Sequence, residues 1–276
     1  MLPLPDALIW GALALAVLLC LARQRTPGLL LLGLALLAAL WLERISSSAL
    51  LISLAGLLLA WRTPSLPTPW RGAALGLVLL WAIALTLHLV PGFDNPKVLD
   101  QVLAGPASVP FNLYLNLDKP LLFFGLLLAW PALLGEGGPI RWRPLALLTL
   151  PLAALLLVAW QLGALRPELG LPHWWWLFAL NNLLFTCVAE EALFRGFIQQ
   201  AIVKRSQVWL GILAASLLFG AAHLAGGPLL VLFATLAGAC YGLAFQLSGR
   251  LSVAILLHFL FNFAHLAFFT YPLASR

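Results

Sequence analysis

Long apolar stretches alternate with short polar or proline-containing connections along the whole chain. A transmembrane helix needs about 20 apolar residues to cross a hydrocarbon core about 30 Å thick. Ten stretches reach or approach this length, at residues 7–22, 28–42, 46–61, 71–90, 121–134, 144–163, 175–203, 208–224, 228–247 and 251–271. The pattern predicts an all-α fold, a polytopic transmembrane helical bundle with about 8–10 spans.

One connection, residues 91–119, is longer than the others and too polar at its ends to span. It contains the segments "PGFDNPKVLD" and "YLNLDKP". We interpret it as a solvated connection or as a loop that faces the substrate. Residues 1–120 are therefore taken as accessory N-terminal transmembrane helices with a following polar loop, and residues 121–276 as the helical core that carries the motifs.

The composition agrees with a membrane protein. Hydrophobic residues make up 63% of the chain, charged residues make up 9%, and the mean hydropathy is +1.03. A water-soluble domain does not have this composition. The net charge of +6 arises from basic residues in the short connections, where membrane insertion favours them, so we expect no nucleic-acid partner. If the chain crosses the membrane ten times and its N-terminus lies outside, more of these basic residues lie on the cytoplasmic side than on the opposite side.

Small residues within the spans are interpreted as packing residues. Three cysteines are scattered without the spacing of a disulfide framework or a zinc site: Cys20, Cys187 and Cys240. In residues 228–247, small residues recur every four positions, at Ala234, Gly238 and Gly242. This spacing predicts a smooth stripe for close contact between helices.

Polar side chains inside the spans are concentrated in the second half of the chain. An ionisable side chain at membrane depth costs about 2.5–3.5 kcal/mol on insertion scales, so it needs a partner or a water-filled cavity. The interiors of the first six spans contain one such residue, His88. Three later spans contain Glu190, Glu191, Arg195, His223, His258, Asn262 and His265. This half is where we expect the chemistry.

The two adjacent glutamates have different expected roles. Glu191 and Arg195 are four residues apart, so they share a helix face and can form an ion pair. Glu190 is rotated by about 100° on the helix and is less well neutralised. It is the candidate base that takes a proton from water and returns it to a leaving amine. The alternative is that the three residues form a purely structural polar contact between helices.

Two histidines on separate helices add to this candidate site. His223 follows Phe219 by one helical turn, and His258 precedes Asn262 by one turn on the same face. A single histidine in a span is commonly a hydrogen-bonded packing residue, but two beside a carboxylate pair favour a site. His265 lies near the end of its span and is interpreted as structural.

The three motifs, in this order, resemble a known family. Glu190-Glu191-x-x-x-Arg195, Phe219-x-x-x-His223 and His258-x-x-x-Asn262 are similar to the motifs of the CAAX protease and bacteriocin-processing family. Its members are intramembrane glutamic proteases related to CAAX prenyl endopeptidases, and the resemblance covers about residues 180–265. It implies an endopeptidase that acts on a membrane-associated peptide or protein. It further implies that Glu190 activates water with help from His223, that His258 and Asn262 stabilise the oxyanion, and that Glu191 and Arg195 shape the site.

Other functions use the same residues differently. Glu190, His223 and His258 could hold a zinc ion with one water, although H-E-x-x-H is absent and the resemblance implies no cofactor. A scaffold or immunity protein would keep the fold without catalysis. A proton-coupled transporter would show broken spans in matching halves, whereas this cluster occupies one half. We expect an integral, multi-pass protein of a bacterial inner (plasma) membrane, with the lipid bilayer and the substrate as its partners.

Overall fold

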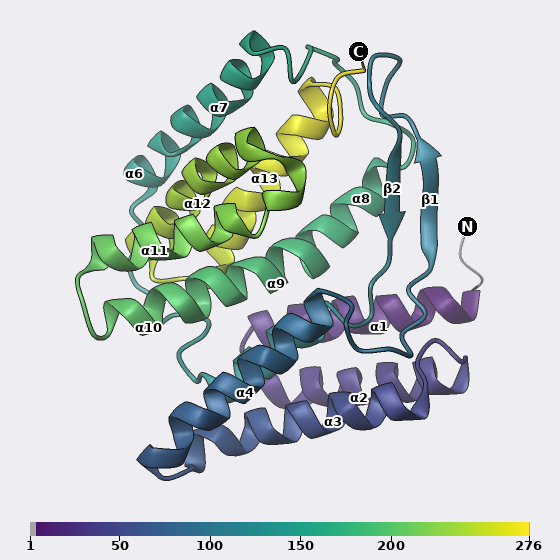
Figure 1. Ribbon diagram of the computed structural model, residues 1–276, viewed down its shortest axis with the longest axis vertical. Coiled ribbons are helices and arrows are strands. Elements are labelled where there is room, and N and C mark those ends of the chain that lie inside the picture. Colours follow the sequence, from purple (N-terminus) through teal and green to yellow (C-terminus); the bar gives the residue numbers. More distant parts are fainter. Residues whose placement is uncertain (1–3, 276) are drawn as a thin grey trace. The chain divides into compact units, whose positions relative to one another are not determined.

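The computed structural model describes residues 4–275, which are mostly helical (Figure 1). They form two compact units, each described by itself below. The first unit comprises Met1–Val98, Leu113–Leu133 and Leu184–Ala189, and the second comprises Leu99–Asn112, Leu134–Leu183 and Glu190–Arg276. Within the described residues, seven helices are long and apolar enough to cross a membrane. The predicted polytopic helical bundle is confirmed.

These seven helices coincide with predicted spans. They are Leu4–Leu21, Ser47–Ser65, Thr68–Thr86, Trp142–Gln161, Trp175–Val203, Pro228–Ser248 and Leu251–Phe268. Two further predicted spans form shorter apolar helices, Arg25–Trp41 and Val208–Ala221. The turn chemistry explains some boundaries, since Pro228 is at the first position of its helix and Gly249 ends the same helix in the left-handed conformation.

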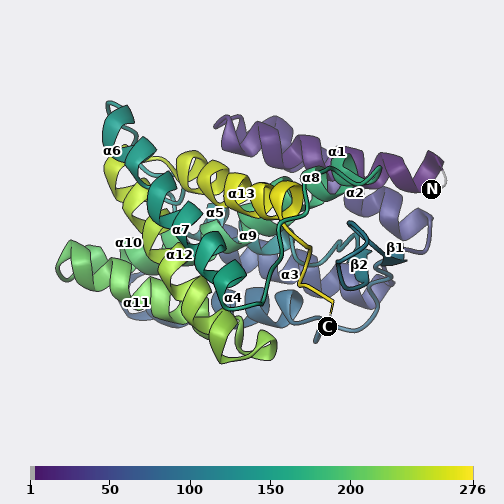
Figure 2. The same cartoon turned by 90° about the horizontal axis from the view of Figure 1, so that it is seen from above.

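The first unit is built from five helices. They are α1 (Leu4–Leu21), α2 (Arg25–Trp41), α3 (Ser47–Arg62), α4 (Thr68–Thr86) and α5 (Leu121–Ala129). α1 packs along α2, and α5 packs against both α3 and α4 (Figure 2). Trp81 of α4 lies against Gly56 of α3 and Gly125 of α5, where a Cβ atom would meet the indole ring. The absence of side chains on these two glycines lets the large ring fit between the helices.

The prediction of a span over residues 121–134 was wrong. α5 has only nine residues, which give a length of about 14 Å at 1.5 Å per residue, too short for the hydrocarbon core. Eight of its nine residues are buried against protein. Its apolar character therefore reflects a core position, which hydropathy alone does not distinguish from contact with lipid. Because the inside–outside assignment was counted over ten spans, it loses its basis.

The polar connection contains a hairpin that the sequence did not predict. β1 (Lys97–Val102) and β2 (Phe111–Tyr114) form a two-stranded sheet, and their arrows point in opposite directions in Figure 1. In the second unit, the Glu168 carboxylate holds the turn between the strands. It accepts hydrogen bonds from Ala107 N at 2.8 Å and from Ser108 Oγ at 2.6 Å.

The second unit contains most of the remaining helices. They are α6 (Trp142–Leu147), α7 (Thr149–Gln161), α8 (Trp175–Asn181), α10 (Gln200–Val203), α11 (Val208–Ala221), α12 (Pro228–Ser248) and α13 (Leu251–Phe268). The short α9 (Val188–Glu191) begins in the first unit and ends in the second with its two glutamates. α11 and α12 form a helical hairpin, α13 packs on α12, and α7 contacts both α12 and α13 (Figures 1 and 2). Phe194, Phe219 and Tyr241 form part of the buried core of this unit.

Candidate active site

The candidate site is built around a helix with two wide turns. Between α8 and α10, residues Asn182–Cys187 and Ala192–Gln199 are π-helical, and they flank the short α9. A π-helix is rare and is frequently found at functional sites, because its wider turns redirect side chains. Glu190 and Glu191 lie between the two wide turns, and Arg195 lies within the second.

Glu191 and Arg195 form the predicted ion pair. Arg195 Nη1 donates to Glu191 Oε1 at 3.0 Å, and both side chains have an exposed fraction of 0%. The prediction from their spacing is confirmed. Two fully buried opposite charges compensate each other, whereas either one alone would be an uncompensated charge in a region of low dielectric constant.

The same carboxylate oxygen of Glu191 also binds a histidine from another helix. His258 Nδ1 lies 2.8 Å from Glu191 Oε1, and the His258 side chain is buried. Since an ionised carboxylate only accepts hydrogen bonds, Nδ1 carries the hydrogen. The other ring nitrogen, Nε2, is therefore the one available to a reacting group. In a neutral ring Nε2 accepts a hydrogen bond, and only the imidazolium donates from it.

Backbone carbonyls of α12 support this network from the other side. Arg195 Nη2 donates to Gly238 O at 2.8 Å, and Gln199 Nε2 donates to Gly242 O at 3.0 Å. Both bonds join residues 43 positions apart, so successive turns of the two helices face each other here. A Cβ atom on Gly238 would lie 2.8 Å from Arg195 Nη2, and one on Gly242 would lie 2.7 Å from Gln199 Oε1. The glycine stripe therefore provides carbonyl acceptors in addition to close packing.

The buried guanidinium also has aromatic neighbours. Arg195 Cζ lies 4.6 Å from the ring centroid of Phe219 and 5.4 Å from that of Tyr241. Cations over aromatic faces are stabilised by the ring quadrupole, more so when they are desolvated. The hydrogen bonds and the two rings together hold Arg195 in one orientation.

The other predicted site residues lie in the same unit. His223 lies just beyond the end of α11, where its Nδ1 donates to Phe219 O at 2.7 Å and its ring centroid is 4.7 Å from that of Phe219. Asn262 Nδ2 donates to Asn182 Oδ1 at 3.2 Å. Glu190 is half-buried, in contrast to the fully buried Glu191.

Sequence reasoning missed several polar residues of this region. Asn182 is buried and bonds to Asn262, and Gln199 is buried and bonds to the backbone of α12. Both are polar side chains within an apolar span, the same signal that identified the glutamates. Tyr241 stacks on His258 but carried no sequence signal, because an aromatic residue in a span is most often a packing residue.

His265 was interpreted as structural, and its Nε2 lies 3.1 Å from Thr270 O.

The zinc-dependent alternative requires Glu190, His223 and His258 to act as ligands. A catalytic zinc usually has three protein ligands that converge on one point. Within residues 4–275, no group of three His, Cys, Asp or Glu side chains is placed to hold a metal ion. Glu190, His223 and His258 therefore do not form such a group in the described part of the chain.

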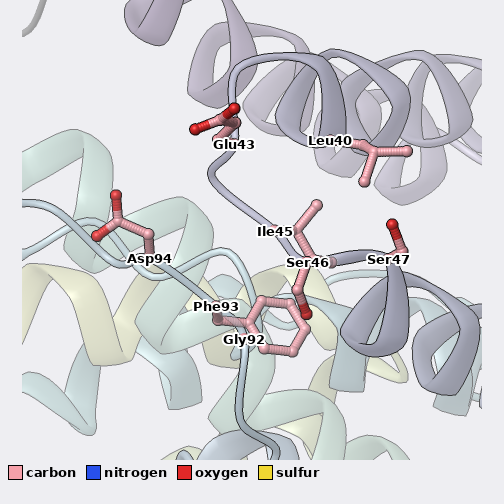
Figure 3. A pocket seen from close by; sticks show the side chains of 8 residues that line it. All are labelled: Leu40, Glu43, Ile45, Ser46, Ser47, Gly92, Phe93 and Asp94. Atoms are coloured by element: carbon pink, nitrogen blue, oxygen red, sulfur yellow. The ribbon is translucent and has the colours of Figure 1, made fainter.

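A pocket of about 480 Å³ lies in the first unit, beside the connection between α2 and α3 (Figure 3). Its wall includes the carboxylates of Glu43 and Asp94. Arg44 pairs with Asp94 and with Asp6, and the hydrogen bonds that it donates to the Asp6 carboxylate raise the pKa of Arg44 above its usual value. The residues that line the pocket include none of the predicted catalytic residues.

The fold and the buried network define the class of this protein. It is an integral, multi-pass membrane protein with a carboxylate, guanidinium and imidazole network in one of its units. Residues 172–264 match the model of the family described as "Rce1-like: Type II CAAX prenyl endopeptidase Rce1-like". The match confirms the predicted resemblance to the CAAX protease family over these residues. Neither the curated proteins nor the solved structures gave a significant match.

Proposed function

We propose that this protein is an intramembrane endopeptidase that hydrolyses a peptide bond of a membrane-associated protein or peptide by means of glutamate-activated water. The observation that carries the proposal is the buried network of Glu191, Arg195 and His258, next in sequence to the half-buried Glu190. Ionisable groups at membrane depth are expensive and usually serve a function. We place the protein in a bacterial inner (plasma) membrane as part of the same proposal.

Glu190 is the proposed base. Its carboxylate takes a proton from water while the water oxygen attacks the carbonyl carbon of the scissile peptide bond. The carbonyl oxygen then carries negative charge in a tetrahedral intermediate. As the C–N bond breaks, the proton on Glu190 passes to the leaving nitrogen, so that a carboxylic acid and an amine are released.

His223 is the proposed second contact for the attacking water. Its Nδ1 hydrogen is engaged by the backbone oxygen of Phe219. In the neutral ring, Nε2 is therefore an acceptor, which suits a hydrogen bond from water.

Asn262 and His258 are the proposed donors to the oxyanion. The amide of Asn262 has two N–H groups, and one of them is directed to Asn182. Because its Nδ1 hydrogen is directed to Glu191, His258 donates from Nε2 only as the imidazolium. Removal of a single oxyanion donor typically lowers kcat by about 10²–10³.

An apolar groove of about 440 Å³ supports a substrate with a hydrocarbon part. It lies between α7 and α13 in the second unit, and its lining includes Leu152, Leu156, Leu257 and Phe261. Leu257 and Phe261 directly precede His258 and Asn262 in the sequence. A lipid-anchored or membrane-embedded peptide can place apolar groups there.

The test is Glu190→Gln, which removes the charge and keeps the shape of the side chain. The purified protein is reconstituted in liposomes with a peptide that ends in a farnesylated cysteine and three further residues, and cleavage is followed by mass spectrometry. We expect Glu190→Gln to abolish cleavage without loss of folding. Glu136→Gln, which changes an exposed glutamate in a connection, is the matched control and should cleave like the wild type. Full activity of Glu190→Gln would overturn the assignment.

A further inference from the structure

α12 contains none of the predicted site residues, yet it contacts two of them. Gly238 accepts a hydrogen bond from Arg195, and the ring of Tyr241 stacks on the ring of His258. The centroids of the two stacked rings are 4.5 Å apart, with an angle of 15° between the planes. Gly238 and Tyr241 are three residues apart, so they lie on the same face of α12. This face therefore lies against both ends of the buried network.

Two different restraints act on the His258 imidazole. The hydrogen bond to Glu191 fixes the position of Nδ1, but a ring held at one nitrogen can still swing about that bond. The second side-chain torsion of histidine has a broad, roughly twofold preference, so it does not by itself select a ring plane. Tyr241 contacts the face of the ring, and Phe219 contacts it edge-on with centroids 5.6 Å apart and an interplanar angle of 86°.

Tyr241 is itself held firmly. Its exposed fraction is 1%, and Arg195 Cζ lies 5.4 Å from its ring centroid. Its ring thus contacts both the guanidinium that pairs with Glu191 and the imidazole that bonds to Glu191.

We propose that Tyr241 is a positioning residue for the reaction described above, and the inference rests on that proposed function. Its ring sets the plane of the His258 imidazole, so that Nε2 keeps one direction toward the reacting group. The residue acts through His258 and does not touch the substrate. A misplacement of about 1 Å in a reacting geometry can lower the rate about 100-fold, which sets the size of the expected effect.

Two substitutions separate positioning from simple packing. Tyr241→Phe keeps the aromatic face, whereas Tyr241→Leu removes it. We expect Tyr241→Leu to lower kcat by about 100-fold with little change in KM, and Tyr241→Phe to remain close to the wild type. Phe245→Leu is the matched control, since Phe245 is a buried aromatic residue one turn further along α12. It should lower stability and leave kcat close to the wild type.

The assay uses the full-length protein in liposomes and the farnesylated peptide described above, with Glu190→Gln measured alongside. Activity in Glu190→Gln would overturn the proposed function. An inactive Glu190→Gln together with a fully active Tyr241→Leu would overturn only the role of Tyr241. Equal loss in Tyr241→Phe and Tyr241→Leu would also overturn it, because the aromatic face would then not be the cause.

A spectroscopic measurement tests the stacking without substrate. In ¹³C-histidine-labelled protein, the Cε1–H signal of His258 is assigned by its loss in His258→Gln. A ring stacked on Tyr241 experiences a ring-current shift, which should disappear in Tyr241→Leu and persist in Tyr241→Phe. An unchanged signal in Tyr241→Leu would overturn the inference, whether or not the wild type cleaves the peptide. Failure of the wild type to cleave the peptide would count against the proposed function only.

Discussion

Replacement of Arg195 by methionine tests the central ion pair most directly. Both partners are fully buried, and the nitrogen and oxygen atoms are 3.0 Å apart. Removal of one partner leaves the other charge buried without compensation, which typically costs about 3–5 kcal/mol. Arg195→Met also removes the hydrogen bond to Gly238 O, and hydrogen bonds to charged groups contribute about 1.5–3 kcal/mol. Because these contributions overlap, we expect the free energy of unfolding to fall by about 3–5 kcal/mol.

The double variant Glu191→Leu/Arg195→Met measures the interaction energy of the ion pair. Replacement of a whole buried ion pair by apolar residues is often neutral or stabilising, so the double variant should lose less stability than Arg195→Met alone. Contacting residues show interaction energies of about 0.5–3 kcal/mol, and a fully buried pair should lie at the upper end. The double variant should nevertheless be inactive, since His258 has lost the carboxylate that orients it.

Unfolding can be followed by the fluorescence of the 12 tryptophans while the protein, in mixed micelles, is titrated with a denaturing detergent. Arg62→Met is the control, because Arg62 is exposed and surface substitutions usually change stability by less than about 0.5 kcal/mol. If the effects of Glu191→Leu and Arg195→Met simply add to within about 0.5 kcal/mol, the two side chains do not interact and the reasoning is refuted.

Two further predictions concern packing and metal dependence. Gly56→Ala should lower stability by about 1–3 kcal/mol in the same unfolding assay, because the added methyl group would overlap the ring of Trp81. Gly76→Ala, which has open space at the Cβ position, should be neutral or stabilising by up to about 1 kcal/mol, and the reverse ranking would contradict the packing of the first unit. A chelator should leave peptide cleavage unchanged, because the proposed mechanism uses no metal. Loss of activity that zinc restores would favour the zinc-dependent alternative.

Most helices of this fold could be predicted from hydropathy. Hydropathy did not indicate whether a helix is buried in protein or faces lipid. In the part of the chain that the structure describes, seven apolar stretches form helices long enough to span, whereas the stretch after Pro120 forms a short helix buried in protein. An apolar run has the same composition in both environments. The hairpin in the polar connection was also missed, because its strands are short and their residues are mostly half-exposed or exposed.

The candidate site divides in a similar way. The pair of Glu191 and Arg195 could be predicted because their contact is local, four residues apart on one helix. The bond from His258 to Glu191 joins residues 67 positions apart, so it depends on tertiary packing that no spacing rule reports. The role of Gly238 was only half predicted. Its small size was read correctly as allowing close contact, but the acceptor is a backbone atom, which the residue type does not reveal.

The backbone contacts of α12 have a practical consequence for protein design. Someone who grafts the three motifs onto another helical bundle would transfer Glu191, Arg195 and His258 but not the carbonyl that holds the guanidinium. The recipient scaffold would need a neighbouring helix with glycine at the facing position and the same register. Without such a helix, the transplanted arginine would lack its carbonyl acceptor. The grafted carboxylate would then lose the positively charged partner that compensates its burial.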